Sequence, residues 1–156
     1  MGGLFKYPMK IETASLIDLG ALRTLEKACF DRDAWGLLDL IAVLTFPDIV
    51  RLKAVEDGGM VGFVAGDPRP AEGFAWIATI GVDPRYHRRG YGRALLRACE
   101  ARLRLPGVRL TVRMSNGPAI HLYEQEGYRT VDIWKSYYND GEDGVVMEKP
   151  LKSAAK

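Results

Sequence analysis

The 156-residue sequence has little cysteine, no long apolar run and almost no net charge. Its two cysteines, Cys29 and Cys99, occupy apolar positions of helical patterns. They therefore predict buried free thiols rather than a disulfide framework, and with them a cytoplasmic location. No apolar run reaches the roughly 18–20 residues that span a membrane, and residues 1–10 lack the apolar core of a signal peptide. Lys6 replaces the Ser/Thr of a myristoylation motif, which argues against lipidation.

The formal net charge of +2 is too small for a general nucleic-acid binder. The positive charge is uneven, however, because arginines crowd one stretch: Arg85, Arg88, Arg89, Arg93, Arg97, Arg102 and Arg104. This crowding predicts a local anion site. The chain has no internal repeat and no long low-complexity linker, so its length and composition predict one domain over residues 1–156. Neither a metal site nor a membrane or nucleic-acid partner is expected.

The first half of the chain mixes helical and strand patterns. It predicts a strand at 9–13, helices at 15–30 and 33–46, and a hairpin of strands 49–56 and 60–66 around the turn 57–59. Ser15 and Asp18 form a candidate cap pair for the first helix. Asp33 is expected to cap the second helix, which Pro47 ends. Residues 67–73 are expected to form a loop.

The second half carries a clearer order of elements. It predicts strands at 74–82, 108–114, 128–138 and 144–151, and helices at 89–104 and 117–127. A strand–helix–strand unit over 74–114 implies one parallel, right-handed crossover. The flanking hairpins imply antiparallel pairing. The fold class is therefore α/β in the broad sense, an α+β mixed sheet with helices packed on it.

The stretch "DPRYHRRGYGRALL", residues 83–96, places two glycines between arginines and the start of a helix. Such turns often bind phosphates. A Rossmann-type dinucleotide site would need a third glycine where Leu95 stands, and a longer alternation of strands and helices. A P-loop would need a Gly-Lys-Ser/Thr ending, which is absent. A purely structural role, in which the glycines only allow tight packing of the helix start, remains the third interpretation.

The surroundings of this turn resemble the pyrophosphate-binding signature of the GNAT acetyltransferases, Gln/Arg-x-x-Gly-x-Gly/Ala after a Val-x-Pro strand end. Val82-Asp83-Pro84 supplies the strand end, and Gly90 and Gly92 supply the glycines. His87 stands where the family has Gln or Arg.

A second stretch, "NGPAIHLYEQEGY", is similar to the second GNAT signature. The matching residues are Asn116, Ala119, Tyr123, Gly127 and Tyr128. Two signatures in the right order extend the resemblance over residues 74–128. The flanking segments more loosely resemble the RimI-type N-terminal protein acetyltransferases.

The resemblance implies the GNAT fold: a central mixed, mostly antiparallel sheet with one β-α-β crossover and helices on both faces. It also implies acetyl-CoA as cofactor, with its pyrophosphate on the backbone N–H groups of the glycine turn. The implied cofactor-binding residues are Ile80, Val82, His87, Arg88, Arg89, Gly90, Tyr91, Gly92, Arg93, Asn116, Ala119 and Tyr123. The strands ending at Val82 and Met114 would splay apart to admit the pantetheine arm.

In the resembled family an acceptor amine attacks the thioester directly, which agrees with the absence of a credible Ser/His/Asp or Cys/His set. The resemblance makes the Val82 N–H the group that polarises the carbonyl, and Tyr123 the general acid for the leaving thiolate. Tyr137 and Tyr138 would lie in the loop over the acceptor site. Purely structural roles remain open for these side chains. Tyr123 could be a core residue, Tyr137 and Tyr138 ordinary aromatics at a strand end, Asn116 a helix cap, and the arginines a solvated face.

The general base has no obvious candidate. RimI-type enzymes and their relatives place a base where this chain has Thr111 and Trp76, neither of which accepts a proton usefully. Glu26 and a water chain are the remaining options. An α-amine has a pKa near 7.7–8.0 against about 10.4 for lysine, so a tenth or more of α-amines are already neutral at pH 7. A site without a strong base therefore favours an α-amine acceptor.

The sequence therefore predicts an acetyl-CoA-dependent N-acetyltransferase that acts on a protein or peptide N-terminus. A small-molecule amine is the alternative acceptor, and a non-catalytic acyl-CoA-binding domain is the alternative class. The chain is expected to be a monomer or a homodimer.

Overall fold

The computed structural model describes residues 9–151. The expectations that residues 1–8 hold neither a signal peptide nor a lipid anchor lie outside the described residues. Within the described range, no helix combines the length and the apolar character needed to cross a membrane.

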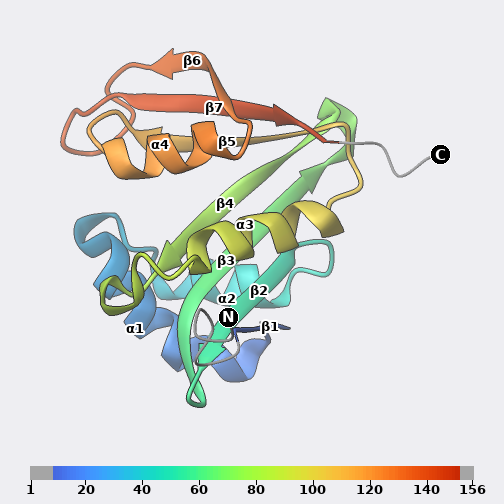
Figure 1. The fold of residues 1–156 in the computed structure, drawn as a ribbon, viewed down its shortest axis with the longest axis vertical. Coiled ribbons are helices and arrows are strands. Elements are labelled where there is room, and N and C mark those ends of the chain that lie inside the picture. The colour runs from blue at the N-terminus through green and yellow to red at the C-terminus, as the bar shows by residue number, and fades with distance from the viewer. Residues whose placement is uncertain (1–8, 152–156) are drawn as a thin grey trace, which may run out of the picture. The chain divides into compact units, whose positions relative to one another are not determined.

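In residues 9–151 the chain forms a mixed sheet of seven strands with four α-helices (Figure 1). The strands are β1 (Lys10–Thr13), β2 (Val50–Glu56), β3 (Gly59–Arg69), β4 (Phe74–Val82), β5 (Gly107–Arg113), β6 (Arg129–Trp134) and β7 (Gly144–Pro150). The helices are α1 (Leu19–Phe30), α2 (Leu37–Thr45), α3 (Tyr91–Arg102) and α4 (Gly117–Gln125). The strand order is β1-β2-β3-β4-β5-β7-β6. β4 and β5 pair in parallel while β1–β2, β2–β3, β5–β7 and β6–β7 are antiparallel, which confirms the predicted mixed sheet and its crossover.

The chain divides into two compact units. Unit 1 contains the described residues up to Gly66 together with Ala78–Arg102. Unit 2 contains Asp67–Ile77 and the described residues from Leu103 onward. β4 thus gives its first half to unit 2 and its second half to unit 1. The single domain over residues 1–156 stays a prediction.

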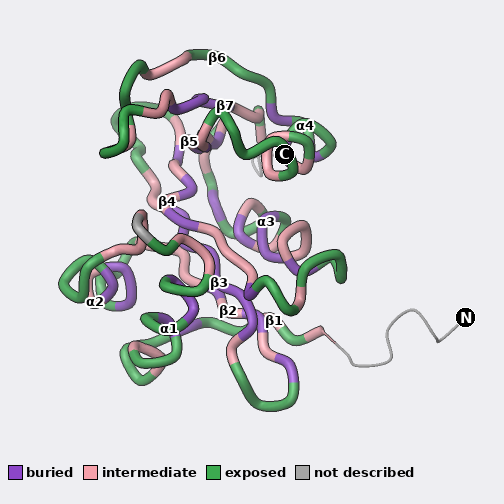
Figure 2. The backbone as a smooth tube through the Cα atoms, turned by 90° about the vertical axis from the view of Figure 1, so that its left-hand side faces the viewer, coloured by how far each residue is buried: buried purple, intermediate pink, exposed green. Residues whose placement is uncertain are grey.

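In unit 1, β3 shows why helices cover both faces of the sheet. Successive side chains of a strand point to opposite faces. Phe63 is buried in a cluster with Leu22 of α1 and Leu40 of α2. A Cβ on the preceding Gly62 would lie 2.8 Å from Leu95 Cδ1, so the bare glycine lets α3 approach the other face. The middle of β3 is correspondingly buried along its length (Figure 2).

The predicted hairpin is confirmed, and its turn explains the register. Asp57 and Gly58 both have positive φ, at 53° and 79°. Two such residues form the type I′ turn whose twist matches a two-residue hairpin. Glu56 and Gly59 consequently pair across the turn.

Three predicted boundaries are wrong. The helix expected from Asp33 starts only at Leu37, because Ala34 is extended and the N–H of Trp35 donates to the Glu26 carboxylate instead of to a helical carbonyl. The strand expected over 128–138 ends at Trp134, since Ser136 has a φ of 50° that turns the chain. The loop expected over 67–73 is partly strand, as β3 continues to Arg69.

Candidate functional site

The residues expected to bind phosphate form an exposed turn between β4 and α3. Asp83 ends the strand and accepts the N–H of Arg85 at 2.9 Å, and the hydrogen bonds from the Arg85 side chain and backbone lower the pKa of the Asp83 carboxyl. His87 Nε2 donates to the carbonyl oxygen of Val82 at 2.8 Å. This hydrogen bond connects the turn to the end of β4, so His87 stabilises the conformation of the turn.

The turn is open and leads into the N-terminus of a helix. Arg88 and Gly90 have positive φ, at 65° and 83°, and residues 87–90 are exposed. The space at Gly90 is open, because no atom lies within 4 Å of where a Cβ would stand. The turn leads into α3, a helix of 12 residues. The N–H groups of a helix's first turn have no intrahelical partner and carry partial positive charge, so this end can receive a phosphate group.

The three arginines predicted as phosphate ligands have different surroundings. Arg88 is exposed and Arg93 is half-buried. Arg89 forms an ion pair with Glu56 of β2, with its Nη1 3.0 Å from Glu56 Oε2. The charge of Arg89 is therefore paired with a carboxylate of the β2–β3 hairpin.

Glu26 of α1 is a buried carboxylate with two neutral donors. It is 3% exposed, and it accepts hydrogen bonds from the Trp35 N–H at 3.3 Å and from the Thr79 hydroxyl at 3.0 Å. Burial raises the pKa of the Glu26 carboxyl, and the two hydrogen bonds oppose this only partly. Because Thr79 lies on β4, Glu26 connects α1 to the strand that ends at Val82.

In unit 2 the second signature builds the start of α4. Asn116 is the N-cap, and its Oδ1 accepts the N–H of Ala119 at 3.3 Å. Tyr123 is 8% exposed, and its ring lies 5.8 Å from that of Tyr128. Burial raises the pKa of Tyr123 to about 12, with a smaller contribution from Tyr138. The Tyr123 hydroxyl therefore keeps its proton at neutral pH and is available as a donor.

Both positions where relatives carry a base lie in an aromatic environment. Five rings form a continuous chain with centroids 5.0–5.8 Å apart: Phe74, Trp76, Trp134, Tyr137 and Tyr138. A Cβ on Gly144 would lie 2.9 Å from Thr111 Cγ2 and 3.2 Å from Tyr137 Cβ, so Thr111 and Tyr137 both pack closely against the bare backbone of Gly144. Tyr137 is still 51% exposed. The two positions where a base was expected, Thr111 and Trp76, thus carry no acidic or basic side chain.

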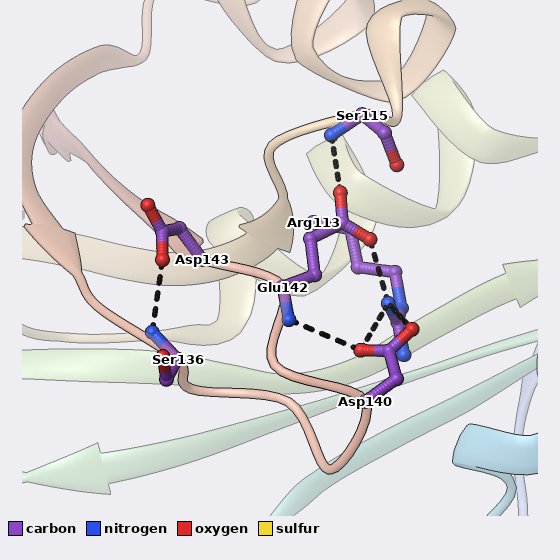
Figure 3. Close-up of polar contacts among 6 residues, drawn as sticks. All are labelled: Arg113, Ser115, Ser136, Asp140, Glu142 and Asp143. Atoms are coloured by element: carbon purple, nitrogen blue, oxygen red, sulfur yellow. Dashed lines mark hydrogen bonds and ion pairs between the residues drawn. The ribbon is translucent and has the colours of Figure 1, made fainter.

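The loop that carries both tyrosines is fixed by carboxylates (Figure 3). Arg113, at the end of β5, contacts Glu142 at 2.6 Å and Asp140 at 3.0 Å, and its guanidinium lies 4.3 Å from the Tyr138 ring centroid. Glu142 also accepts the N–H of Ser115 at 2.7 Å. This cluster was not predicted from the sequence, although three carboxylates within "NDGEDG" made an arginine partner plausible.

Glu56 was also missed. Its signal was the period-two alternation of β2, in which Leu52, Ala54 and Glu56 are buried. A carboxylate in a buried position of a strand indicates a partner elsewhere in the fold. No group of three or more His, Cys, Asp or Glu side chains among residues 9–151 could hold a metal ion.

Comparison with known proteins agrees with the sequence signatures. The model of the acetyltransferase (GNAT) family matches residues 20–128. An N-alpha-acetyltransferase of Sulfurisphaera tokodaii is 36% identical over 111 residues, which cover 61% of this chain and 65% of that protein. The [ribosomal protein bS18]-alanine N-acetyltransferase of Escherichia coli is 43% identical over 83 residues, covering 49% of this chain and 56% of that protein. The matched segment thus spans less than two thirds of the length of these curated relatives.

A solved structure matches almost the whole chain. The crystal structure of the ribosomal-protein-S18-alanine N-acetyltransferase from Escherichia coli superposes with a TM-score of 0.84 at 29% identity. The match covers 96% of this chain and 97% of that one. The predicted fold is therefore confirmed.

Proposed function

The chain belongs to the acetyltransferase (GNAT) family, and from this premise we propose that it transfers an acetyl group from acetyl-CoA to the α-amine of a peptide or protein N-terminus. The observation that carries the proposal is the pair of positions Thr111 and Trp76, which offer no base to a strongly basic acceptor. The named activities of the relatives from Sulfurisphaera tokodaii and Escherichia coli support the same acceptor class.

The open turn at the start of α3 fits the pyrophosphate of coenzyme A. The main-chain N–H groups of Tyr91 and Gly92 would face the phosphates, and Arg88 and Arg93 would add charge nearby. Ile80 and Val82 would bind the pantetheine arm through their backbone, and Asn116 and Ala119 would support it from α4. Acetyl-CoA supplies an activated acyl group, so the chain needs no nucleophile of its own.

The remaining chemistry divides between two groups. The Val82 N–H would stabilise the negative charge that develops on the carbonyl oxygen. Tyr123, held protonated by burial, would donate its hydroxyl proton toward the departing sulfur. The acceptor ammonium loses one proton to water before attack, and this step is easy for an α-amine with a pKa near 7.7–8.0. The nitrogen loses a second proton to water as the amide forms and the C–S bond breaks, and Tyr123 regains from water the proton that it gave to the sulfur.

The acceptor is proposed to lie against Tyr137 and Tyr138. Tyr137 is half exposed and continues into the rings of Trp134 and Trp76. Although neighbouring rings are tilted against one another, such a chain offers apolar ring surface to the first residues of a peptide. A small-molecule amine is the second candidate, because GNAT folds serve more than one class of acceptor.

The test is to mix the protein with acetyl-CoA and two sets of acceptors, short peptides with free N-termini and a panel of polyamines, amino acids and aminoglycosides. Release of coenzyme A thiol is measured for each. We expect turnover with peptides that begin with Ala, Ser or Met. Turnover of a small amine with none for any peptide would replace the first acceptor class by the second, and coenzyme A binding without any turnover would support a non-catalytic domain.

A further inference from the structure

The turn that precedes α3 is attached to the β2–β3 hairpin by a buried carboxylate. Glu56 is 7% exposed. Carboxylates are almost never fully buried unless they are paired. Glu56 Oε2 lies 3.0 Å from Arg89 Nη1, and Glu56 Oε1 accepts the hydroxyl proton of Tyr91. We call these three residues, Glu56, Arg89 and Tyr91, the hairpin clamp.

The clamp holds the turn on both sides of Gly90. Arg89 precedes this glycine and Tyr91 follows it, and Gly90 itself has a φ of 83°. Tyr91 is 3% exposed, and burial raises its pKa to about 12, so the hydroxyl stays a donor to Glu56. Because Arg89 and Tyr91 both bind the Glu56 carboxylate, the backbone between them, including the N–H of Gly90, is held in one orientation.

Tyr86 completes the surroundings of Arg89. The Arg89 guanidinium lies 5.0 Å from the centroid of the Tyr86 ring, and the rings of Tyr86 and Tyr91 meet edge to face at 6.4 Å. The Arg89 side chain is 50% exposed, so its other face remains in water. Its charge is nevertheless directed at Glu56.

We propose that Glu56 is a positioning residue for the coenzyme A turn, and that Arg89 serves to neutralise Glu56 rather than to bind phosphate. The inference rests on the proposed function, since it concerns how the turn receives coenzyme A. An uncompensated carboxylate beside the turn would repel an incoming pyrophosphate, because like charges a few ångströms apart in a partly buried site interact strongly. Removing Arg89 therefore harms binding mainly through the carboxylate that it leaves behind.

The test is a double-mutant cycle on coenzyme A affinity, measured by titration calorimetry with coenzyme A itself. Arg89→Met is expected to weaken binding about tenfold, a moderate effect because the guanidinium is half exposed. Glu56→Gln, which keeps an oxygen for Tyr91, is expected to weaken it less. In the Arg89→Met/Glu56→Gln double variant, binding should recover to within about threefold of the Glu56→Gln level, so the two losses are not additive.

A matched control separates this local effect from the general field of the arginines. Arg102→Met removes the same charge at the far end of α3, about 16 Å away by helix geometry. It should change the affinity less than about twofold. Equal weakening by Arg102→Met and Arg89→Met would contradict the clamp.

A second readout does not need a ligand. Tyr91→Phe removes only the hydroxyl bond to Glu56. It should speed amide hydrogen exchange at Ala94, whose N–H donates to the carbonyl oxygen of Gly90 at 3.0 Å, without changing exchange in β3. Unchanged exchange at Ala94 would overturn the positioning role of Glu56. This measurement remains valid if Glu56→Gln were to reduce the folded population.

The cycle also distinguishes the inference from the function on which it rests. If the wild-type protein binds coenzyme A and the two losses add fully, Arg89 is a direct phosphate ligand and only the inference is wrong. If the wild-type protein binds no coenzyme A, the proposed function and the inference both fall.

Discussion

At the scale of single residues, the proposed role of Tyr123 as general acid leads to a specific kinetic prediction. Tyr123→Phe keeps the buried ring but removes its proton, so kcat should fall by about a hundredfold or more while the KM for acetyl-CoA changes little. Steady-state kinetics with a peptide acceptor measure both constants. Tyr128→Phe is the matched control, because its ring is also buried and lies 5.8 Å away. Full activity in Tyr123→Phe would exclude this residue as the acid.

Glu26 gives a prediction on stability against pH. Its pKa is raised above the ordinary 4.5, so between 4.5 and the raised value the folded state binds more protons than the unfolded state. Stability of the wild-type protein therefore falls as pH rises through this window, and the loss persists above it. Glu26→Gln removes the charge and can keep both hydrogen bonds. Urea unfolding at several pH values should show the variant gaining stability relative to wild type as pH rises from about 4.

The same variant tests whether Glu26 acts as a base. If no dedicated base exists, the pH dependence of kcat/KM should have the same shape in wild type and in Glu26→Gln. A rise of kcat/KM near neutral pH that is present in the wild type and absent in the variant would contradict the account. It would make Glu26 a proton acceptor.

At the scale of elements, the loop of residues 136–143 depends on one glycine of β7. A Cβ on Gly144 would stand 2.9 Å from Thr111 and 3.2 Å from Tyr137, closer than such atoms normally approach. Gly144→Ala should destabilise the protein by about 1–3 kcal/mol, as other overpacked sites do, and should raise the KM for a peptide acceptor. Gly20→Ala in α1 is the control, since nothing lies within 4 Å of its Cβ. Equal effects of the two substitutions would contradict the close packing of Thr111 and Tyr137 against Gly144.

The carboxylates of this loop predict how it responds to acid. Hydrogen bonds from Ser115 and Arg113 lower the pKa of Glu142, and the N–H of Ser136 lowers that of Asp143. A lowered pKa means that the stabilisation is present above the ordinary values of 4.5 and 3.8 and is lost as pH falls through the folded values. The loop should therefore loosen in acid before the sheet does.

Nuclear magnetic resonance can follow this through the amides of Ser115 and Ser136, which donate to the two carboxylates. Both resonances should shift as pH falls below about 4, while those of the buried strand β7 stay fixed. Glu142→Gln should abolish the response of Ser115 and leave that of Ser136. A loop response that coincides with global unfolding would contradict the prediction.

Local patterns predicted most of the elements, and the errors arose where a distant residue decides the backbone. Period-two alternation and the Asp57–Gly58 turn were sufficient for the hairpin. The start of α2 was not predictable, because Glu26, nine residues away, takes the N–H of Trp35. Likewise, "GYGRALL" predicted a helix start from its own residues, but the ion pair of Arg89 with Glu56 spans 33 residues, so no local pattern could name the two residues as partners.

At the scale of the whole molecule, each compact unit holds its own set of predicted functional residues. Unit 1 contains the turn before α3, with Val82 and the hairpin clamp, and unit 2 contains Tyr123 and the loop of Tyr137 and Tyr138. The two sequence signatures predicted both sets because each signature is contiguous in the chain. That Thr111 and Trp76 supply no base was predictable in the same way, since it depends on the identity of these two residues alone.

The central claim is that the chain acetylates α-amines in preference to lysine. The most direct measurement is tandem mass spectrometry of one peptide that carries both a free N-terminus and an internal lysine, after incubation with acetyl-CoA at pH 7. The account predicts a single acetyl group on the α-amine, because at this pH the α-amine is neutral more than about a hundredfold more often than lysine. Acetylation of the lysine with the N-terminus left free would contradict it.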